Sequence, residues 1–331
     1  THMINSERTV LPGPRSGHAK ICASKSRAHR LLIMAALSRT PSVLECSGLS
    51  SDIIATIDCL NRLGADISYG ENGVITVEPV RTKNASDTMP VLPCRDSGST
   101  LRFLLPLVGA LGINACFKME GRLPERPFAP FDNELEAHGM KLGKKGDLLY
   151  CSGQLKPGAY TLPGNISSQY ISGLLMSLPL LNGDSTLLVT GSIESTDYIN
   201  MTEDACRLAG IQIDRLDSRS GSSTAVNNAP DPLKPDITSK PGAAVGPDST
   251  ANPHEPLTPF HTSVPQNLPG TDKAVSAAPS RIYRITGNCS YRLPHRLKVE
   301  GDWSGAAFFL CLGSLSPEGI IVSGVDTASL Q

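Results

Sequence analysis

The apolar and polar positions of this chain repeat one order of secondary-structure elements along its length. Stretches with the alternation typical of a half-buried strand are followed by stretches with apolar residues three and four apart, as in an amphipathic helix. The first set of patterns predicts strands at 18–22 and 42–46, helices from the turn at 25–30 to about 38 and at 52–64, and a hairpin of strands 66–69 and 74–78. We expect Asp52 to cap the second helix and Gly64 to end it.

The same order of elements recurs twice further along the chain. The second set has a strand at 89–92, a turn at 96–100, a helix, a strand at 114–119, a helix at 130–138 and a hairpin through 144–147. The third set starts at 160, with a turn at 167, a helix, a strand at 186–190, a helix at 201–208 and a strand at 211–214. Self-similarity at a fixed period marks a repeat architecture, so we predict an α/β domain of three β-α-β-α-β-β units.

The hairpin of the third unit is interrupted by residues 217–280. This segment holds eleven of the 26 prolines of the chain, together with Ser, Thr, Gly and Asn. Such a composition buries too little apolar surface to offset the entropy of ordering, so we interpret it as a disordered insertion at the tip of a hairpin. The strand pattern resumes at 281–285.

A fourth unit begins near residue 299 and stops before its second helix is reached. We therefore predict a first domain at 17–298, interrupted by the insertion, and an incomplete second domain of the same kind at 299–331. Residues 1–3 look like a vector remnant, and the rest of 1–16 is expected to add a strand to the second domain.

Composition and charge describe an ordinary protein with a hydrophobic core. The 331 residues carry a formal net charge of −1 and are 40% hydrophobic, which gives no general footprint for nucleic acid. The nine cysteines include no Cys-x-x-Cys pair, and no His lies near them at metal spacing, so we expect reduced thiols and no metal site. No apolar run approaches the length of a membrane span, so we predict a cytoplasmic protein with no membrane association.

Four polar turns, each followed by an apolar helix, are the candidate chemistry of the chain. They lie at Ser26, Ser97, Ser167 and Ser304, about 71 residues apart once the insertion is left out. A Ser- and Gly-rich turn at the start of a helix presents backbone N–H groups at the positive end of the helix dipole, where a phosphate binds. A single turn of this kind is usually only a helix cap, but four in register indicate an anion site.

Five motifs in order carry a resemblance to a known family. They are Ser24-Lys25-Ser26 with Arg30, the run 96–102, Glu125-Arg126-Pro127, Ser167-Ser168-Gln169, and the run 299–304. With these motifs the chain resembles the EPSP synthase (3-phosphoshikimate 1-carboxyvinyltransferase) family over its whole length except the insertion. The resemblance implies two domains, each an inside-out α/β barrel of three such units. It also implies transfer of the enolpyruvyl group of phosphoenolpyruvate to the 5-hydroxyl of shikimate 3-phosphate, with no cofactor and a monomeric complete protein.

The resemblance also implies roles for residues of the first turn. Lys25 would contact phosphoenolpyruvate, and Ser26 and Arg30 would hold the carboxylate and ring of the shikimate. The chemistry of the side chains agrees, because Arg offers a planar fork for a carboxylate and Lys a mobile point charge. Cations at a helix start are unfavourable against the dipole, which favours a binding role over a solvated surface.

The second turn would form the phosphate corner for phosphoenolpyruvate. Gly98 would let the backbone approach that phosphate, and Arg126 would grip it, unless Arg126 forms only a surface ion pair. Asp96 stands where many relatives carry Asn; it would line the same corner, and the alternative is that it is only the helix cap. We expect Arg102, one turn into the helix, to be structural.

The third turn and the loop after it would bind the other substrate. Ser167 and Ser168 would donate to the 3-phosphate, with helix capping as the alternative. Gln169 would pack over the shikimate ring and reach the enolpyruvate. Ser195 and Tyr198 match the next loop of the family, where the Ser helps to bind the 3-phosphate.

The catalytic residues of the family are expected beyond Gln331. Its general base Asp, its catalytic Lys and the arginines around the enolpyruvyl carboxylate belong to the second domain, so we expect no catalytic residue in this chain and no turnover by it alone.

Two alternatives remain. One is the UDP-N-acetylglucosamine enolpyruvyl transferase family, although that family typically has Lys-Asn at Lys25-Ser26 and needs a reactive Cys in a loop, whereas Cys116 lies in an apolar strand. The other is a non-catalytic domain that binds a phosphate ligand or recruits partners through its Pro-rich insertion.

Overall fold

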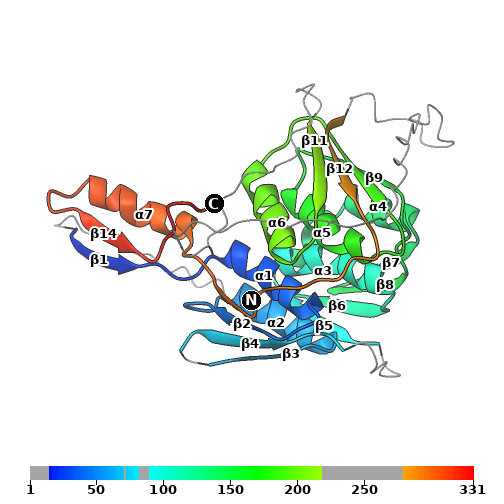
Figure 1. Cartoon of the computed structure of the whole chain (residues 1–331), viewed down its shortest axis with the longest axis horizontal. Coiled ribbons are helices and arrows are strands. Elements are labelled where there is room, and N and C mark those ends of the chain that lie inside the picture. The colour runs from blue at the N-terminus through cyan, green and yellow to red at the C-terminus, as the bar shows by residue number, and fades with distance from the viewer. Residues whose placement is uncertain (1–14, 71, 82–88, 218–278) are drawn as a thin grey trace, which may run out of the picture. The chain divides into compact units, whose positions relative to one another are not determined.

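The predicted repeat forms three four-stranded sheets in the computed structural model, which describes residues 15–70, 72–81, 89–217 and 279–331 (Figure 1). Every described residue belongs to one unit of the chain, and the other unit, Thr224–Ser276, lies outside the described residues. The sheets have the orders β13-β2-β4-β3, β5-β6-β8-β7 and β11-β12-β10-β9. In each, one pair is parallel and two are antiparallel, as expected for β-α-β-α-β-β units.

The strand bounds follow the predicted order. The first sheet contains β2 (Ser42–Glu45), β3 (Asp66–Tyr69), β4 (Val74–Glu78) and β13 (Arg296–Lys298). The second contains β5 (Val91–Arg95), β6 (Ala115–Met119), β7 (Met140–Lys145) and β8 (Leu148–Gly153). The third contains β9 (Ala159–Pro163), β10 (Ser185–Thr190), β11 (Ile213–Asp217) and β12 (Pro279–Ile285). Alternate residues of β4 and β10, such as Ile75 and Leu187, are buried, so one face of each sheet covers the core.

The helices of the described ranges pack against one another. Their bounds are α1 (Lys25–Leu37), α2 (Ser51–Arg62), α3 (Gly98–Leu111), α4 (Phe131–Ala137), α5 (Ser168–Ser177), α6 (Thr196–Leu208) and α7 (Trp303–Ser314), with short 3-10 turns η1 (Leu123–Glu125) and η2 (Leu178–Leu180). Contacts run from α6 to α1, α1 to α2, α2 to α3, α3 to α5, and α5 back to α6. Nearly every residue of α3 is buried, which explains why its sequence is apolar on all sides.

A proline and a glycine allow α3 and α5 to approach closely. Pro106 lies inside α3 and has no N–H, so the carbonyl of Arg102 loses its usual helical partner. A Cβ added at Gly173 of α5 would lie only 2.5 Å from that carbonyl oxygen and 3.1 Å from Cγ of Pro106. Only glycine fits at this crossing.

The first predicted strand has a different partner from the one expected. β1 (Gly17–Lys20) pairs in parallel with β14 (Ile320–Ser323) in a separate two-stranded sheet, and β13 occupies the parallel position beside β2. The prediction that this strand opens the first unit was therefore wrong. The alternation of a four-residue strand identifies it as a strand but says nothing about its partner, which is set by contacts far away in the sequence.

The interrupted hairpin of the third unit is confirmed, with shifted ends. β11 and β12 pair in antiparallel register from Ile213 opposite Ile285 to Asp217 opposite Arg281, and the Arg281 Nε–Asp217 Oδ1 ion pair measures 2.6 Å. Residue 217 and residues 279–280 are thus strand residues rather than part of the insertion. The remainder of the predicted disordered insertion, 218–278, lies outside the described residues, as does the predicted strand within 1–14.

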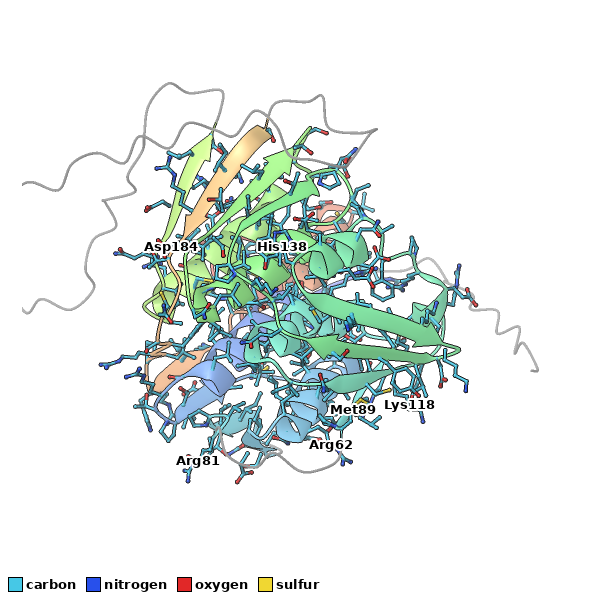
Figure 2. The ribbon with its side chains drawn as sticks, turned by 90° about the vertical axis from the view of Figure 1, so that its right-hand side faces the viewer. Arg62, Arg81, Met89, Lys118, His138 and Asp184 are labelled. Carbon is cyan, nitrogen blue, oxygen red and sulfur yellow. The ribbon has the colours of Figure 1, made fainter. Side chains whose placement is uncertain are left out.

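Three of the charged side chains mark the periphery of the described region. Figure 2 shows Arg62, Arg81 and Lys118 at the outer edge of the ribbon, and all three are exposed. None of the helices in the described ranges is both long enough and apolar enough to cross a membrane. α7 exposes large apolar side chains, with Phe308 80% and Leu310 45% accessible.

Candidate functional site

The beginnings of four helices meet at one pocket of about 410 Å³. Eight of the predicted site residues line it: Lys25, Ser26, Arg30, Ser167, Ser168, Gln169, Ser195 and Tyr198. Sequence reasoning missed four further lining residues: Ser99, Phe103, Ile166 and Glu194. Because the lining residues come from the first two turns of α1, α3, α5 and α6 or from the two residues before a helix, the positive ends of four helix dipoles converge on the same space.

Serine side chains cap three of these helices. Ser24 Oγ accepts the Arg27 N–H at 3.2 Å, Ser97 Oγ the Thr100 N–H at 3.3 Å, and Ser167 Oγ the Gln169 N–H at 3.2 Å. The capping alternative is therefore correct for Ser167, although its hydroxyl can still donate to a ligand. The Ser26 turn, in contrast, is already part of α1.

The start of α6 is held in a strained backbone conformation. Ser195 has φ 55° and ψ 43°, in the left-handed region that few residues other than glycine occupy, and its side chain makes no capping bond. α6 begins at Thr196, earlier than the helix predicted at 201–208, so Tyr198 belongs to its first turn rather than to a loop. Strain of this kind is retained where the surroundings demand it, as is frequent at ligand sites.

Arg30 is a buried cation at the junction of three helices. Its guanidinium donates to Thr202 Oγ1 at 2.6 Å, to the carbonyls of Ser26 and Tyr198 at 2.8 Å each, and to Ser172 Oγ at 3.2 Å. It also lies 5.0 Å from the ring centroid of Phe103.

The charge of Arg30 has no counterion among the described residues. Within the part of the chain that the structure describes, no carboxylate lies within ion-pair distance of it. Burial first, and then the neighbouring Arg27, lower the pKa of Arg30 to about 9, so the group stays protonated near neutral pH. A buried charge without a counterion favours an anion in the pocket that it lines.

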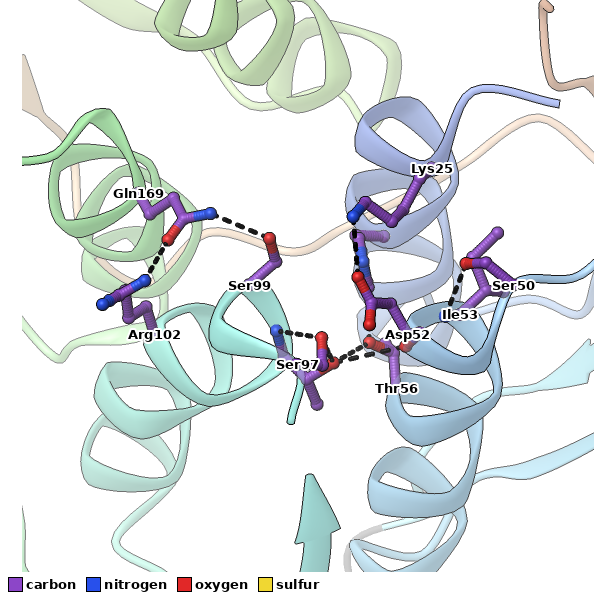
Figure 3. Close-up of polar contacts among 11 residues, drawn as sticks. Lys25, Ser50, Asp52, Ile53, Thr56, Ser97, Ser99, Arg102 and Gln169 are labelled. Carbon is purple, nitrogen blue, oxygen red and sulfur yellow. Dashed lines mark hydrogen bonds and ion pairs between the residues drawn. The ribbon is translucent and has the colours of Figure 1, made fainter. Parts of the chain in front are cut away.

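Lys25 is held by a carboxylate of the neighbouring helix. Its Nζ lies 2.7 Å from Asp52 Oδ2, an ion pair visible in Figure 3. The prediction that Asp52 caps α2 was wrong, because Ser50 Oγ accepts the Ile53 N–H at 3.3 Å and leaves Asp52 free to pair. Since the Lys25 side chain is 46% exposed, this ion pair is weak enough to exchange for a ligand.

Gly98 lies beside two guanidinium groups, and neither it nor the two arginines belong to the pocket lining. A Cβ added to it would be 2.7 Å from Arg102 Nη1 and 3.1 Å from Arg126 Nη1, so the first turn of α3 and two cations form one corner. Asp96 is exposed and is not the cap, since Ser97 has that role. The structure therefore brings Gly98 and Arg126 together, but shows no contact between Asp96 and either of them.

A buried chain of side-chain hydrogen bonds runs from α1 through Thr56 of α2 to the first turn of α3. His29 Nδ1 bonds Thr56 Oγ1, Thr56 bonds Thr100 Oγ1, and Thr100 donates to the cap Ser97, each at 2.7 Å. Burial lowers the pKa of His29 to about 3, so its imidazole is neutral. The two anion-type turns are thus held in fixed positions relative to each other.

The pocket is suited to binding a polyanion rather than to acid–base chemistry. Its lining contains two cations, Lys25 and Arg30, and one carboxylate, Glu194. Helix N-termini and serine hydroxyls supply the other donors. The described ranges contain no group of three or more His, Cys, Asp or Glu side chains that could hold a metal ion. All nine cysteines are free thiols.

Comparison with known proteins gives a consistent result. The family whose sequence model matches residues 11–236 is EPSP synthase (3-phosphoshikimate 1-carboxyvinyltransferase). A 3-phosphoshikimate 1-carboxyvinyltransferase of Clostridium botulinum is 40% identical over 328 residues, 97% of this chain and 60% of that protein. Its counterpart in Clostridium beijerinckii is 39% identical over 212 residues, 62% of this chain and 48% of that protein.

A solved structure shares the fold. EPSP synthase from Acinetobacter baumannii matches with a TM-score of 0.64 at 17% sequence identity, over 96% of this chain and 58% of that one. The chain spans about half to three fifths of the length of the relatives it matches.

Proposed function

Because the chain belongs to the EPSP synthase (3-phosphoshikimate 1-carboxyvinyltransferase) family, we propose that it provides the substrate-binding half of such an enzyme. The complete protein would transfer the enolpyruvyl group of phosphoenolpyruvate to the 5-hydroxyl of shikimate 3-phosphate and release phosphate. The observation that carries the proposal is the buried cation Arg30, which lacks a carboxylate partner in the described ranges and lies where four helix N-termini converge. This arrangement favours a ligand with several negative charges.

The pocket is the proposed site of shikimate 3-phosphate. Ser167, Ser168 and Ser195 would donate to its 3-phosphate, and Ser26 and Arg30 would bind its carboxylate and ring. Gln169 and Tyr198 would enclose the ring from α5 and α6. The support for these roles is that all seven residues line one pocket of a volume suited to a small molecule.

The corner at Gly98 is the proposed site of the phosphate of phosphoenolpyruvate. Arg126 would pair with it, Gly98 would give it access to the backbone of α3, and Lys25 would reach it after leaving Asp52. The support is the clustering of Arg126 Nη1 with Gly98 and the partial exposure of Lys25. The role of Asp96 stays a prediction.

The acid and base for the reaction are proposed to come from outside this chain. Attack by the 5-hydroxyl on the enolpyruvyl carbon requires a group to remove the hydroxyl proton and another to protonate the adjacent carbon. The only carboxylate of the pocket lining is Glu194, which is also exposed, and no lining residue is a His. We therefore expect this chain to bind substrate without turning it over.

The architecture of the family extends the proposal to the domains. We propose that the three sheets and their inner helices form an inside-out α/β barrel, and that residues 299–331, with β1, belong to a second domain of the same kind. The exposed apolar side chains of α7 and the pairing of β1 with β14 support this division. A cytoplasmic location and a monomeric complete protein stay predictions.

The alternative enolpyruvyl acceptor, UDP-N-acetylglucosamine, is less well supported. That chemistry would need a reactive thiol in a loop at the site, whereas no residue of the pocket lining is a Cys. Cys116 is buried in β6, where burial and the nearby Asp147 raise its pKa. A phosphate-release assay with phosphoenolpyruvate tests both acceptors. The full-length protein should release phosphate with shikimate 3-phosphate and not with UDP-N-acetylglucosamine, and this chain alone should release none. The reverse preference would overturn the proposal.

A further inference from the structure

The side-chain amide of Gln169 is held at both ends by residues of α3. Its Oε1 accepts a hydrogen bond from Arg102 Nη1 at 2.7 Å, and its Nε2 donates to Ser99 Oγ at 2.9 Å, as Figure 3 shows. Since a guanidinium can only donate, the oxygen of the amide must face Arg102 and the nitrogen must face Ser99. The two bonds fix both the position and the orientation of this pocket residue.

Arg102 is itself fixed by its surroundings. Its guanidinium carbon lies 5.5 Å from the centroid of the Tyr170 ring, and its Nη1 is beside Gly98. Its Nε is buried without a hydrogen-bond partner, and no carboxylate in the described ranges pairs with its charge. Its bond to Gln169 is therefore a charge-assisted hydrogen bond in a partly buried setting, roughly twice as strong as a neutral one.

The backbone beneath this contact is also constrained. The close approach of Gly173 to the carbonyl of Arg102 holds α5 against α3. Gln169 precedes Gly173 by four residues and so lies on the same face of α5. The packing of α5 against α3 places Gln169 beside Arg102, and the side-chain hydrogen bonds then fix the rotamer of Gln169.

We propose that Arg102 is a positioning residue for the substrate pocket, which acts by orienting the amide of Gln169. This inference rests on the proposed function for the identity of the ligand. It assigns a role to a residue that is absent from the pocket lining and that the sequence presents as structural. Two rival roles are direct contact between Arg102 and the ligand, and a purely structural role.

A double-mutant cycle on this chain separates these roles. Shikimate 3-phosphate is titrated calorimetrically into the wild type, Arg102→Met, Gln169→Ala and the double variant. We expect Arg102→Met to weaken binding about tenfold, and the double variant to bind no more weakly than Gln169→Ala alone. Arg122→Met, which removes an arginine that is 89% exposed, is the matched control and should bind as the wild type does.

Each contrary outcome is informative. Additive losses in the double variant would mean that Arg102 acts on the ligand without Gln169, and unchanged binding in Arg102→Met would mean that the orientation does not matter; either overturns the proposal. If circular dichroism shows that Arg102→Met does not fold, Ser99→Ala is measured instead, because it removes the hydrogen bond at the other end of the Gln169 amide. It should weaken binding about threefold, again with no further loss when Gln169 is replaced. Full affinity in Ser99→Ala would contradict the proposal.

A readout without ligand distinguishes failure of this inference from failure of the proposed function. In the free wild-type chain, the side-chain NH₂ signals of Gln169 should be separate from those of exposed glutamines and slow to exchange with solvent, and Arg102→Met should remove both features. If the wild type binds no shikimate 3-phosphate but these signals behave as expected, the function fails and the positioning by Arg102 stands. Signals that are the same in both proteins would refute the positioning.

Discussion

Two buried nitrogen bases of α1, His29 and Arg30, show what burial does to neighbouring side chains of different basicity. Burial lowers the pKa of both, to about 3 for His29 and about 9 for Arg30. Near neutral pH the histidine is therefore neutral and part of a hydroxyl network, whereas the arginine keeps its charge and can bind an anion. Arg30 belongs to the pocket lining, and His29 does not.

The neutral His29 makes stability depend on pH. Between its folded pKa of about 3 and its unfolded value near 6.5, only the unfolded chain binds the proton, so unfolding becomes easier as pH falls. The contribution is fully present above pH 6.5 and is lost by on the order of 1 kcal/mol for each pH unit below it. The free energy of unfolding, measured with urea at several pH values between 4 and 7, should change less steeply with pH in His29→Asn than in the wild type. The exposed His18→Asn variant is the control, and an unchanged slope in His29→Asn would refute this reading.

A substitution at Gly98 tests the corner that this residue forms with Arg102 and Arg126. In Gly98→Ala the new Cβ would displace the Nη1 of Arg102, 2.7 Å away, and with it the support of Gln169. We expect shikimate 3-phosphate to bind about tenfold more weakly, while the free energy of unfolding changes by no more than about 1 kcal/mol. Gly305→Ala, at a comparable early position of α7 with its nearest neighbour at 3.9 Å, should change neither. Titration and thermal unfolding of the same samples measure both quantities.

At the scale of elements, the sequence predicts the helices and turns better than their partners. The Ser-rich turns before α3 and α5 could be found because capping and apolar periodicity are local. The sequence predicts only a structural role for Arg102, because its partner Gln169 is 67 positions away and no local pattern records that contact. The cap of α2 was misassigned because Ser50 and Asp52 are both good cap residues and only the pairing of Asp52 with Lys25 decides between them.

The crossing of α3 and α5 gives a prediction for packing. Gly173→Ala would place a Cβ 2.5 Å from the carbonyl oxygen of Arg102, so the helices must separate. The free energy of unfolding should fall by about 1–3 kcal/mol, as in other overpacked cores. Gly143→Ala in β7, where a Cβ meets nothing within 4 Å, is the matched control. Equal unfolding midpoints for the two variants would contradict the proposed close approach.

At the scale of the whole molecule, the repeat accounts for both the three sheets and the place of the long segment between β11 and β12. The internal period of the sequence located that segment, because the strands on either side must pair for the third unit to be complete. It could not show that β1 leaves the first unit for β14, since that exchange depends on residues some three hundred positions apart. Local sequence patterns predict strand pairing between distant segments less well than any other part of the fold.

The segment between β11 and β12 should be dispensable for ligand binding. β11 and β12 remain paired up to Asp217 opposite Arg281, and no residue of the pocket lining belongs to either strand. Replacing 218–278 with a short Asn-Gly turn should therefore leave the affinity for shikimate 3-phosphate within about twofold. A larger loss, measured by calorimetric titration against the unaltered chain, would assign the segment a role in the site.

The most direct test of the account is a calorimetric titration of this chain with shikimate 3-phosphate and, separately, with shikimate. If the converging helix N-termini and Arg30 form a polyanion site, the phosphorylated ligand should bind at least about tenfold more tightly, and Ser168→Ala should remove most of that difference. Equal affinity for the two ligands, or no binding at millimolar concentration by a chain that circular dichroism shows to be folded, would contradict it.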